Sequence, residues 1–472
     1  MLDWTMTIRF HVMSRHTEVV LALVISSLLG ACGRADDRAA APRHLIFISL
    51  DTVRRDHLPT YGYPRDTAPS IDELAAGGIV FDNALAQDTN TNPSHTSMFT
   101  GVYPHVHGNR TNGIRLAPNQ VTLASILQGA GFRTAGFVTS ITMTRRTTGL
   151  ERGFDIYEDD FVTTRRDGRI ATDLAVDWLR ALKPDDRGFL FLHLYDAHGP
   201  YEPRAPYDAM FRSGEPGPLV ARMPEYQEIF DEHGQPVREL NRFVDLYDGL
   251  IRYVDDCVAS VLAEIDLRES IVVVVADHGE TLGERYWQLD HGGQLFDEQI
   301  RIPLILRVPD LPPQRVAWTA DTVDLLPTLL DLLAVDLPSD RPVLGRNLTP
   351  YLRGEAVPER EWSFASARAV EKRHADRRYK LDTFRRIHSV RTSRWKMIVY
   401  PGRGETFMEL YDLENDAGET INVADRFPKV GANLFEIVNR WKMISAPAKR
   451  ELDLDAQTLQ KLRSLGYLGD AE

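Results

Sequence analysis

Acidic residues follow three apolar runs of the chain, and a histidine stands beside one of them. Asp51 closes HLIFISLD, Asp196 closes GFLFLHLYD, and the pair Asp277 and His278 closes SIVVVVADH. If these runs are parallel strands, their carboxyl ends meet at one edge of a sheet, where ligands bind in such folds. Carboxylates gathered there repel one another unless a cation or a proton joins them. The pattern predicts a metal site for Ca²⁺, Mg²⁺ or Mn²⁺, and the imidazole leaves Zn²⁺ open.

A second candidate group lies in QDTNTNPSHTSMFTG, residues 87–101, where polar residues run into a helical pattern. Pro93 suits the first turn of a helix, because its missing N–H leaves no hydrogen bond unmade there. Thr91 stands beside this helix N-terminus, which favours an anion. A nearby metal would lower the pKa of the hydroxyl, and the alkoxide could attack an ester of phosphoric or sulfuric acid. The alternative is that Thr91 or Asn92 merely caps the helix.

The elements that position these residues alternate between buried strands and amphipathic helices. Four apolar runs have the pattern of strands covered on both faces: 44–51, 188–196, 270–278 and 303–308. Three segments have helical periodicity: 170–182, 244–265 and 321–333. This alternation predicts an α/β fold with a mostly parallel central sheet between helices.

The sequence changes character after about residue 355. HSVRTSRWKMIVY and FMELYDL alternate apolar and polar residues, as half-exposed antiparallel strands do, and a helical pattern follows near 428–443. We therefore expect a catalytic α/β domain over 44–354 and a smaller α+β domain over 355–472. The segment 202–240 is rich in Pro, Gly and charge and is expected to be an insertion over one edge of the sheet.

Residues 1–31 have the shape of a secretory signal, with an apolar run too short for a comfortable membrane span. The run ends in Leu-Gly-Ala-Cys, which resembles a bacterial lipobox, so Cys32 is expected to be lipidated and to become the mature N-terminus. The alternative is an ordinary cleaved signal followed by a chance cysteine. Residues 32–43 would be a tether. The expected location is the bacterial cell envelope, lipid-anchored, in the periplasm or at the outer membrane.

Composition excludes several classes of function. The 55 basic and 68 acidic residues give a net charge of −13, which argues against a nucleic-acid partner. No Gly-rich dinucleotide fingerprint follows a strand, which argues against an oxidoreductase. Cys32 and Cys257 cannot form a disulfide framework, and Cys257 is expected to be a small buried residue. The expected ligand is a small anionic ester, and the expected contact with a membrane is through the N-terminal lipid alone.

These residues belong to longer stretches that resemble the sulfatase family of the alkaline-phosphatase superfamily. NPSHTSMFTGVYPHVHG resembles the nucleophile motif Cys/Ser-x-Pro-Ser-Arg, and LHLYDAHGPYEP resembles the Asp-Pro-His-x-Pro-Tyr segment. VVADHGETLGER and DHGGQLFDEQIRIPLILR resemble the second metal pair and the substrate-contacting stretch after it, and SVRTSRWKMIVY resembles the C-terminal domain. The resemblance covers nearly the whole chain after the tether. It implies the sulfatase-like fold and an enzyme that hydrolyses anionic esters.

The resemblance also assigns roles position by position. It implies that one divalent ion is bound by four residues: Asp51, Thr91, Asp277 and His278. Ca²⁺ is the expected ion, with Mn²⁺, Mg²⁺ and Zn²⁺ as alternatives. His198 and His291 correspond to residues that contact the ester oxygens or the leaving group, and Asn112 stands where related phosphonate and phosphodiester hydrolases place an asparagine near the substrate. Thr52 stands where sulfatases usually have a second acid.

The departures from the family pattern concern the nucleophile. Sulfatases convert Cys or Ser to formylglycine, and the conversion depends on an Arg four residues later; here these positions are Thr91 and His95. Threonine carries a methyl group on its β-carbon and cannot become formylglycine, so none is expected. We predict Thr91 as an unmodified nucleophile with His95 among the catalytic residues, acting on phosphate mono- or diesters or phosphonates. Sulfate-ester hydrolysis and phosphoryl transfer in the cell envelope are alternatives, and a catalytically inactive binding protein is a fourth.

Three further histidines have no assigned role in the resemblance. His105 is expected to be structural, whereas His107 and His193 stay undecided between packing and ligation. A second metal site is not expected, because the spacing of Asp196 and His198 falls short of that in two-zinc relatives.

Overall fold

A computed structural model provides the structure of the protein. It describes residues 41–202, 204–212, 240–284, 289–339, 343–369, 385–444 and 454–464. The signal segment, Cys32 and most of 202–240 lie outside these residues, so the predictions made for them stay predictions. Residues Pro42–Glu472 form one compact unit. No helix in the described part of the chain is both long and apolar enough to cross a membrane.

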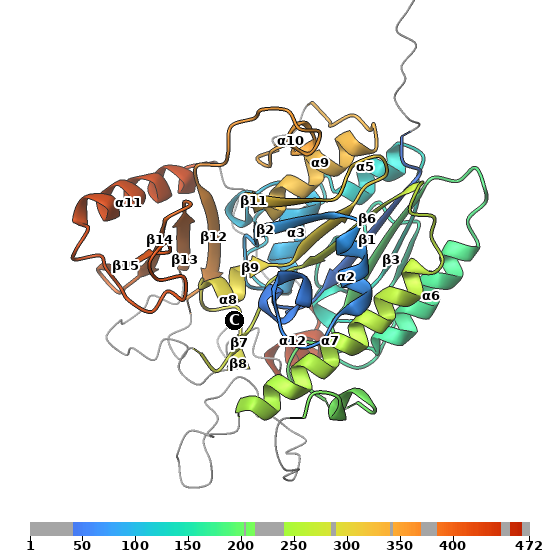
Figure 1. Ribbon diagram of the computed structural model, residues 1–472, viewed down its shortest axis with the longest axis horizontal. Coiled ribbons are helices and arrows are strands. Elements are labelled where there is room, and N and C mark those ends of the chain that lie inside the picture. The colour runs from blue at the N-terminus through green and yellow to red at the C-terminus, as the bar shows by residue number, and fades with distance from the viewer. Residues whose placement is uncertain are drawn as a thin grey trace, which may run out of the picture. The chain divides into compact units, whose positions relative to one another are not determined.

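A nine-stranded sheet forms the centre of this unit (Figure 1). Its order is β11-β2-β10-β6-β1-β5-β3-β4, and β9 pairs with β2. The strands are β1 (His44–Leu50), β2 (Ile79–Leu85), β3 (Arg133–Phe137), β4 (Ile156–Glu158), β5 (Gly188–Leu194), β6 (Ser270–Ala276), β9 (Arg301–Ile302), β10 (Leu304–Arg307) and β11 (Gln314–Asp321). All pairs are parallel except those that β10 makes with β6 and β2 and that β9 makes with β2. The prediction of a mostly parallel sheet is confirmed.

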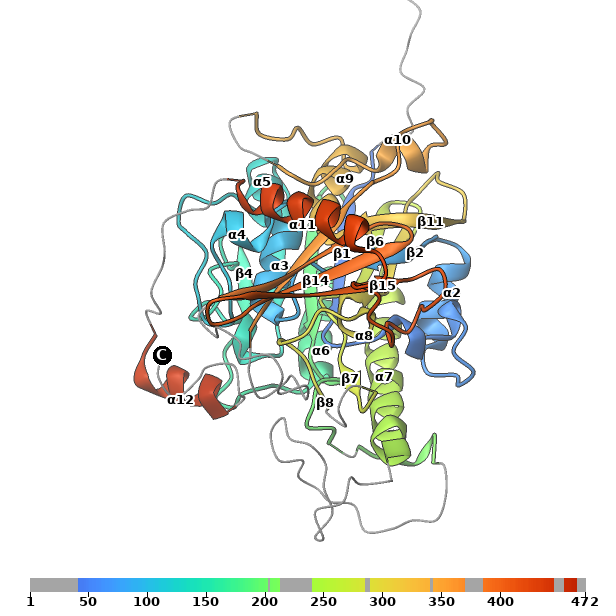
Figure 2. The ribbon, with the colours of Figure 1, turned by 90° about the vertical axis from the view of Figure 1, so that its left-hand side faces the viewer.

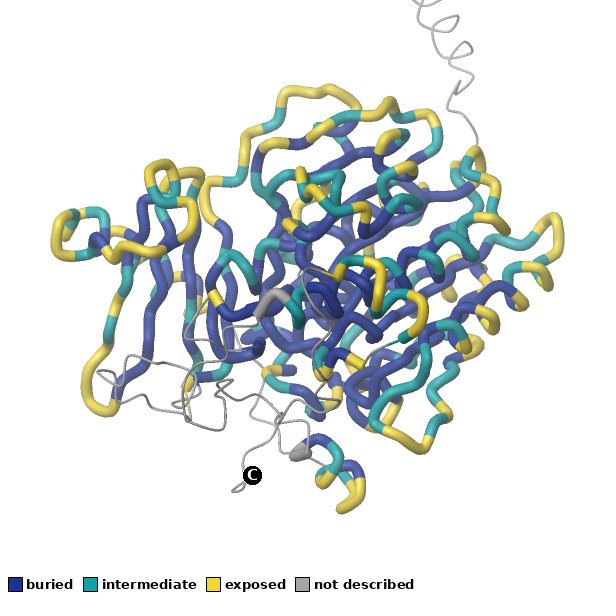
Figure 3. Tube along the Cα trace, turned by 60° about the horizontal axis from the view of Figure 1, so that its bottom comes forward, coloured by how far each residue is buried: buried dark blue, intermediate teal, exposed yellow. Residues whose placement is uncertain are grey.

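Helices cover both faces of this sheet (Figure 1). One face carries α2 (Pro69–Ala76), α6 (Gly168–Arg180) and α7 (Leu240–Leu262), and the other carries α3 (Thr91–Thr100), α5 (Leu123–Gly129) and α9 (Leu325–Leu332). Because both faces are covered, β5 and β6 are buried along their whole length and β1 is buried from its second residue (Figure 3). This explains why the three strands appear in the sequence as continuous apolar runs.

The register of the central strands fixes which strand-end residues come together. Leu50 pairs with Leu194 on one side and with Ala276 on the other. The residue after Leu194 at the end of β5 is Tyr195, and the residue after Ala276 at the end of β6 is Asp277. Asp51, which follows Leu50, therefore lies level with Asp277. Asp196 comes one residue later, where the chain has already turned away.

A four-stranded antiparallel sheet forms the smaller C-terminal part, in the order β12-β13-β14-β15 (Figure 2). Its elements are β12 (Ser363–Arg368), β13 (Arg386–Arg391), β14 (Trp395–Pro401), β15 (Thr406–Asp412) and α11 (Pro428–Lys442). Met397 and Val399 pack toward α11, whereas Ile398 and Tyr400 pack toward Phe296, on the side of the nine-stranded sheet. The predicted α+β character is confirmed. The prediction that the strands of this sheet are half-exposed is wrong for β14. Helix α11 covers one face of β14, and the segment around Phe296 covers the other.

The remaining elements are short. A two-stranded ribbon pairs β7 (Thr281–Leu282) with β8 (Leu289–Asp290). The short helices are α4 (Pro104–His107), α8 (Asp297–Ile300), α10 (Thr349–Leu352) and α12 (Ala456–Ser464). Five 3₁₀ turns complete the described chain: Arg55–His57, Pro59–Tyr61, Ile141–Met143, Tyr207–Ala209 and Thr322–Asp324.

A buried lysine joins the smaller sheet to α8. Lys396 on β14 is fully buried, with its ammonium 2.8 Å from Asp297 and 2.6 Å from Glu419. Removing one partner of a buried ion pair leaves uncompensated charge, which costs about 3–5 kcal/mol. We expect Lys396→Met to lower the free energy of unfolding by about that amount in urea titrations. Lys183→Met, at an exposed position, is the control; equal stability of the two variants would contradict this account.

Candidate active site

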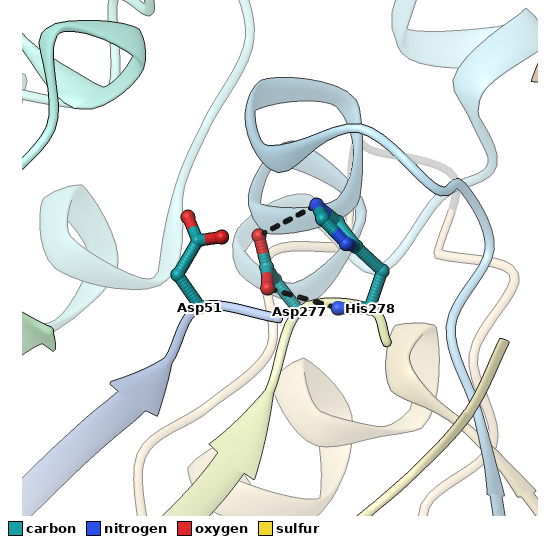
Figure 4. Close-up of side chains that lie close together, drawn as sticks. All are labelled: Asp51, Asp277 and His278. Carbon is teal, nitrogen blue, oxygen red and sulfur yellow. Dashed lines mark hydrogen bonds and ion pairs between the residues drawn. The ribbon is translucent and has the colours of Figure 1, made fainter. Parts of the chain in front are cut away.

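The predicted metal ligands meet at the carboxyl edge of the large sheet (Figure 4). One ligand atom from each of Asp51, Asp277 and His278 can be chosen so that all lie within 4.8 Å of one another. All three side chains are fully buried. Asp51 follows β1 and the other two follow β6, so the register of these neighbouring strands brings them together.

The atoms that face this space have no hydrogen-bond partner among the described residues. They are Asp51 Oδ1, Thr91 Oγ1, Asp277 Oδ2 and His278 Nε2, and the last two lie 3.4 Å from each other. Buried polar atoms are almost always hydrogen-bonded, so four that converge without partners fit a group that binds all of them. Two carboxylate oxygens, a hydroxyl and an imidazole nitrogen are a donor set for a divalent cation.

The electrostatics of the site favour a cation or a proton between the two carboxylates. Burial raises the pKa of Asp51 well above its usual range, and the charge of Asp277 raises it further. Two nearby imidazoles, His95 and His193, do not supply positive charge. Burial lowers the pKa values of His95 and His193 to about 4, so both rings are neutral at neutral pH. A divalent ion would neutralise the two carboxylates.

Thr91 is the first residue of α3, and Asn90 is the N-cap. The Thr91 hydroxyl therefore does not cap the helix. It makes no well-formed hydrogen bond, but it lies near enough to Asp51 to favour the ionised carboxylate. Ser94, in the same helical turn, donates its hydroxyl to the backbone carbonyl of Asp277 at 2.6 Å. This bond holds the first turn of α3 against the metal-ligand strand.

Asn112 is oriented by the same helical turn. Its Oδ1 accepts the backbone N–H of Asn92 at 2.9 Å, which fixes the side-chain amide and leaves its Nδ2 buried without a partner. Pro93 has no N–H, and Ser94 N–H is bonded to the Asn90 carbonyl at 3.1 Å. The N-terminus of α3 therefore offers few free backbone donors for an anion. Asn112 Nδ2 is the better candidate to bind a substrate oxygen.

His95 is fully buried, and both of its ring nitrogens are engaged by the protein. Nε2 lies 2.7 Å from Ser49 Oγ, and Nδ1 lies 2.7 Å from the carbonyl oxygen of Thr91. Nδ1 also lies 3.7 Å from a carboxylate oxygen of Asp277. A direct catalytic role for His95 stays a prediction, because these contacts favour a residue that positions the Thr91 turn against β1.

His198 and His291 lie together beside the metal-ligand group. Their ring centroids are 4.7 Å apart, and the ring of His291 stacks on His278 at 4.5 Å. His291 Nδ1 lies 3.1 Å from Glu280, whose other carboxylate oxygen accepts a hydrogen bond from Tyr201. Burial raises the pKa of Glu280 to about 8, against the lowering effect of the Tyr201 hydroxyl. The arrangement places both histidines beside the metal-ligand group, and their contact with a substrate stays a prediction.

Two candidates from the sequence lie outside the ligand group. Asp196 accepts hydrogen bonds from Gly168 N–H at the start of α6 and from Arg204, each at 3.2 Å. Thr52 directs its hydroxyl to the carbonyl of Asp51 at 2.7 Å, and its N–H donates to Asp277 at 3.3 Å. Its φ of 59° is unusual for a β-branched residue and shows that this turn is strained.

The histidines without an assigned role fall into two kinds. His107 Nε2 lies 3.1 Å from Ser97 Oγ, and its Nδ1 accepts the N–H of Asn109, so its contacts are structural. His105 packs against Trp441 at 4.3 Å between ring centroids, as expected of a structural residue. His193 differs, because its Nε2 lies 3.1 Å from Asp51 Oδ2.

The sequence did not reveal the residues that support these ligands. Glu280, Tyr201 and Ser49 were not singled out. Arg386 on β13 forms a buried ion pair with Asp88, and Asp88 accepts the N–H of Asn90 at 3.0 Å. Glu280 could have been found from the sequence, because it lies two residues after His278 within the stretch VVADHGETLGER. The partner of Asp88 could not be found from sequence, because the two residues lie 298 positions apart.

Comparisons with known proteins assign the family. Residues 43–335 match the Sulfatase family model, which is more than half of the chain. The chain belongs to the sulfatase family. Residues 283–440 of this sulfatase-family enzyme also match the C-terminal region of N-sulphoglucosamine sulphohydrolase. The predicted fold and an ester-hydrolysing activity are thereby confirmed.

Several relatives of this sulfatase-family chain have names that describe an activity. A Δ4,5-hexuronate-2-O-sulfatase of Bacteroides thetaiotaomicron is 25% identical over 485 aligned positions, covering 93% of this chain and 96% of the relative. The multifunctional alkaline phosphatase superfamily protein PehA of Trinickia caryophylli is 23% identical, covering 66% and 77%. The crystal structure of the phosphonate monoester hydrolase of Agrobacterium radiobacter matches with a TM-score of 0.68 and 20% identity, covering 87% of this chain and all of that one.

Proposed function

We propose that this sulfatase-family enzyme is a metal-dependent hydrolase of phosphate mono- or diesters or phosphonates, with unmodified Thr91 as its nucleophile. The observation that carries the proposal is the Thr91 hydroxyl. It is buried, it makes no well-formed hydrogen bond in the described structure, and it lies beside Asp51 in the metal-ligand group. A hydroxyl in that position is available to attack an ester bound at the same place.

The proposed reaction has two displacement steps. The Thr91 hydroxyl gives up its proton as its oxygen forms a bond to phosphorus, and the bond from phosphorus to the leaving-group oxygen breaks. Asn112 Nδ2 holds an ester oxygen, and His198 and His291 contact the leaving group, which takes up a proton as it departs. Water then attacks phosphorus and releases Thr91 with its proton restored. A divalent ion bound by Asp51, Thr91, Asp277 and His278 would supply positive charge and lower the pKa of the hydroxyl.

Phosphorus is preferred over sulfur because of the residue type at position 91. A formylglycine hydrate can release sulfate by breaking its own C–O bond. A threonine ester has no such route and must be cleaved by water at phosphorus or sulfur. Sulfate-ester hydrolysis is the second candidate, because the family match and the Δ4,5-hexuronate-2-O-sulfatase relative favour it. A phosphoryl transferase of the cell envelope is the third.

An activity panel tests these alternatives. The full chain is assayed with an aryl phosphate, a bis-aryl phosphate, an aryl phosphonate monoester and an aryl sulfate, each with Ca²⁺, Mn²⁺, Mg²⁺ and Zn²⁺. The proposal predicts that one phosphorus ester has the highest kcat/KM. Faster turnover of the aryl sulfate than of all phosphorus esters would favour the second candidate. Transfer to an added alcohol in preference to water would favour the third.

Glu280 gives a prediction about the leaving group. Its hydrogen bond to Nδ1 of His291 fixes the ring, and general acid catalysis is typically worth about 10²–10⁴-fold. We expect Glu280→Leu, which removes this hydrogen bond, to reduce kcat by about 10²-fold for an alkyl ester and by less than about 10-fold for a nitrophenyl ester. Tyr201→Phe, which keeps the carboxyl group, should have a smaller effect with the same trend. An equal loss for both esters would contradict a role at the leaving group.

We also propose that the protein is a lipoprotein of the cell envelope, anchored through Cys32. Support comes from the Leu-Gly-Ala-Cys sequence that follows the apolar run. Metabolic labelling with a fatty-acid analogue should mark the wild-type protein and not Cys32→Ala. Cys257→Ala is the matched control, because that cysteine is buried. An unlabelled wild-type protein in the soluble fraction would contradict the proposal.

A further inference from the structure

One guanidinium group of the smaller sheet contacts the turn from Asp88 to Thr91, which we call the nucleophile turn. Arg386 lies at the start of β13 and forms a largely buried ion pair with Asp88. Its guanidinium also donates to the backbone carbonyl of Arg110, two residues before Asn112. We propose that Arg386 is a positioning residue that holds the nucleophile turn and the segment of Asn112 in the arrangement that the reaction needs. The inference rests on the proposed function, which assigns Thr91 and Asn112 their roles.

Asp88 connects this guanidinium to the N-terminus of α3. Its Oδ1 accepts the backbone N–H and the side-chain amide N–H of Asn90, each at 3.0 Å, and its Oδ2 accepts from Arg386. Asn90 is the N-cap residue, and its carbonyl accepts the Ser94 N–H at 3.1 Å. The Asn90 side chain makes no capping hydrogen bond and donates to Asp88 instead. Asp88 therefore holds the residue that directly precedes Thr91.

The ion pair keeps this carboxylate in place. Asp88 is fully buried, and burial raises its pKa, whereas the charge of Arg386 and the hydrogen bonds from Asn90 oppose that shift. Hydrogen bonds to an ionised carboxylate are stronger than those to a neutral acceptor. Without the guanidinium, Asp88 would be a buried unpaired charge, which favours its protonation or a movement of the turn toward water.

The planar shape of the guanidinium suits a junction between two segments. Its Nη2 donates to Asp88, and its Nη1 donates to the carbonyl of Arg110. Its Nε and Nη2 also lie 3.3 and 3.1 Å from Ser366 Oγ on β12. The N–H of Ser366 donates to the Gln87 carbonyl at 2.9 Å, so the backbone of β12 holds the start of the same turn. Arg386 is thus anchored in the smaller sheet and bonded to both active-site segments.

A second ion pair on the same strand provides a matched comparison. Arg391, at the other end of β13, lies 2.5 Å from Asp297 on α8. The side chains of Arg386 and Arg391 are only 12% and 9% exposed, so both are largely shielded from water. Asp297 also accepts from Lys396, and its N–H donates to Glu419, so this pair holds α8 and not the nucleophile turn. A structural role shared by the two arginines predicts equal effects on kcat, whereas a positioning role of Arg386 predicts different ones.

Chemical rescue of a truncated arginine tests the inference. The full-length, metal-loaded variant Arg386→Ala is assayed with the best ester of the activity panel, and kcat is expressed per folded molecule from circular dichroism. We expect a loss of about 10²-fold, because small displacements of reacting groups have effects of that size. Added ethylguanidinium should recover about 10-fold of the loss, whereas ethylammonium lacks the planar fork and should recover less. Arg391→Ala should lose stability in urea but keep kcat within about 3-fold of wild type.

Asp88→Asn takes the place of Arg386→Ala if that variant does not fold. It keeps the size of the side chain but removes the charge that pairs with the guanidinium, and should lower kcat by about 10-fold. Equal losses of kcat in Arg386→Ala and Arg391→Ala, or wild-type kcat in Arg386→Ala or in Asp88→Asn, would overturn the inference. Failure of the proposed function is read separately. Wild-type turnover by Thr91→Ala would refute that function, whereas the comparison of the two arginines uses whichever ester is turned over fastest.

Discussion

Replacing Thr91 with alanine is expected to reduce kcat by at least about 10³-fold, because the remaining site offers only binding and charge stabilisation. Thr91→Ser keeps the oxygen and should retain part of the activity. The thermal stability of the metal-free protein should not fall with the activity. The hydroxyl is buried without a partner, so removing it relieves a desolvation penalty in the metal-free protein. Metal-free Thr91→Ala should therefore unfold at the same temperature as wild type or higher.

The matched control for Thr91 is Thr96 in the same helix. Its hydroxyl donates to the Asn92 carbonyl at 2.8 Å and accepts from Asn109 Nδ2 at 3.0 Å. Thr96→Ala should lose some stability and keep most of its kcat. Wild-type turnover by Thr91→Ala would show that Thr91 is not the nucleophile. A loss of activity together with a loss of folded protein would show that the residue is structural.

Replacing Asp277 with asparagine is expected to remove metal and activity together. The change deletes one of two carboxylates that neutralise the ion, so we expect affinity to fall by at least about 100-fold. Metal-free protein should behave differently. Asp277 raises the pKa of Asp51 because the two charges repel, so Asp277→Asn should be more stable than wild type in the presence of a chelator. Added metal should then stabilise wild type much more than the variant.

Asp196→Asn is the control for this prediction. Asp196 also ends an apolar run, but it contacts Gly168 and Arg204 and lies outside the ligand group. Its metal content, measured by elemental analysis after dialysis, should match that of wild type. Full metal occupancy in Asp277→Asn, or loss of metal in Asp196→Asn, would contradict the assignment of ligands.

The central sheet was predictable from sequence because three of its strands are covered on both faces. Continuous apolar runs followed by acids identified β1, β5 and β6, and the order of these strands placed Asp51 and Asp277 at one edge. The run 303–308 predicted β10, whereas β2, β3, β4, β9 and β11 were missed. β2 and β11 carry polar residues among apolar ones, and β3 is only five residues long, so their patterns are weak.

Side-chain geometry limited what could be said about the site. The sequence predicted that Asp196 lies beside Asp51 and Asp277. Asp51 and Asp277 come one residue after the paired positions at the strand ends, whereas Asp196 comes two residues after, and it lies outside the group. The sequence also left His193 undecided, because strand periodicity does not show which side chain a buried histidine will contact. In the structure it contacts Asp51 at 3.1 Å, a residue 142 positions away in the chain. The alternative that Thr91 caps α3 was resolved by the helix boundary, since Asn90 holds the N-cap position.

The most direct test of the account is whether Thr91 becomes covalently phosphorylated during turnover. Metal-loaded enzyme is mixed with a slow aryl phosphate or phosphonate, quenched in acid and digested. The peptide that spans residues 87–110 is then analysed by mass spectrometry. The account predicts an ordinary threonine at position 91 before reaction and a phosphoryl or phosphonyl group on Thr91 during it. A modified Thr91 in the resting enzyme, or turnover with the covalent group on another residue, would contradict it.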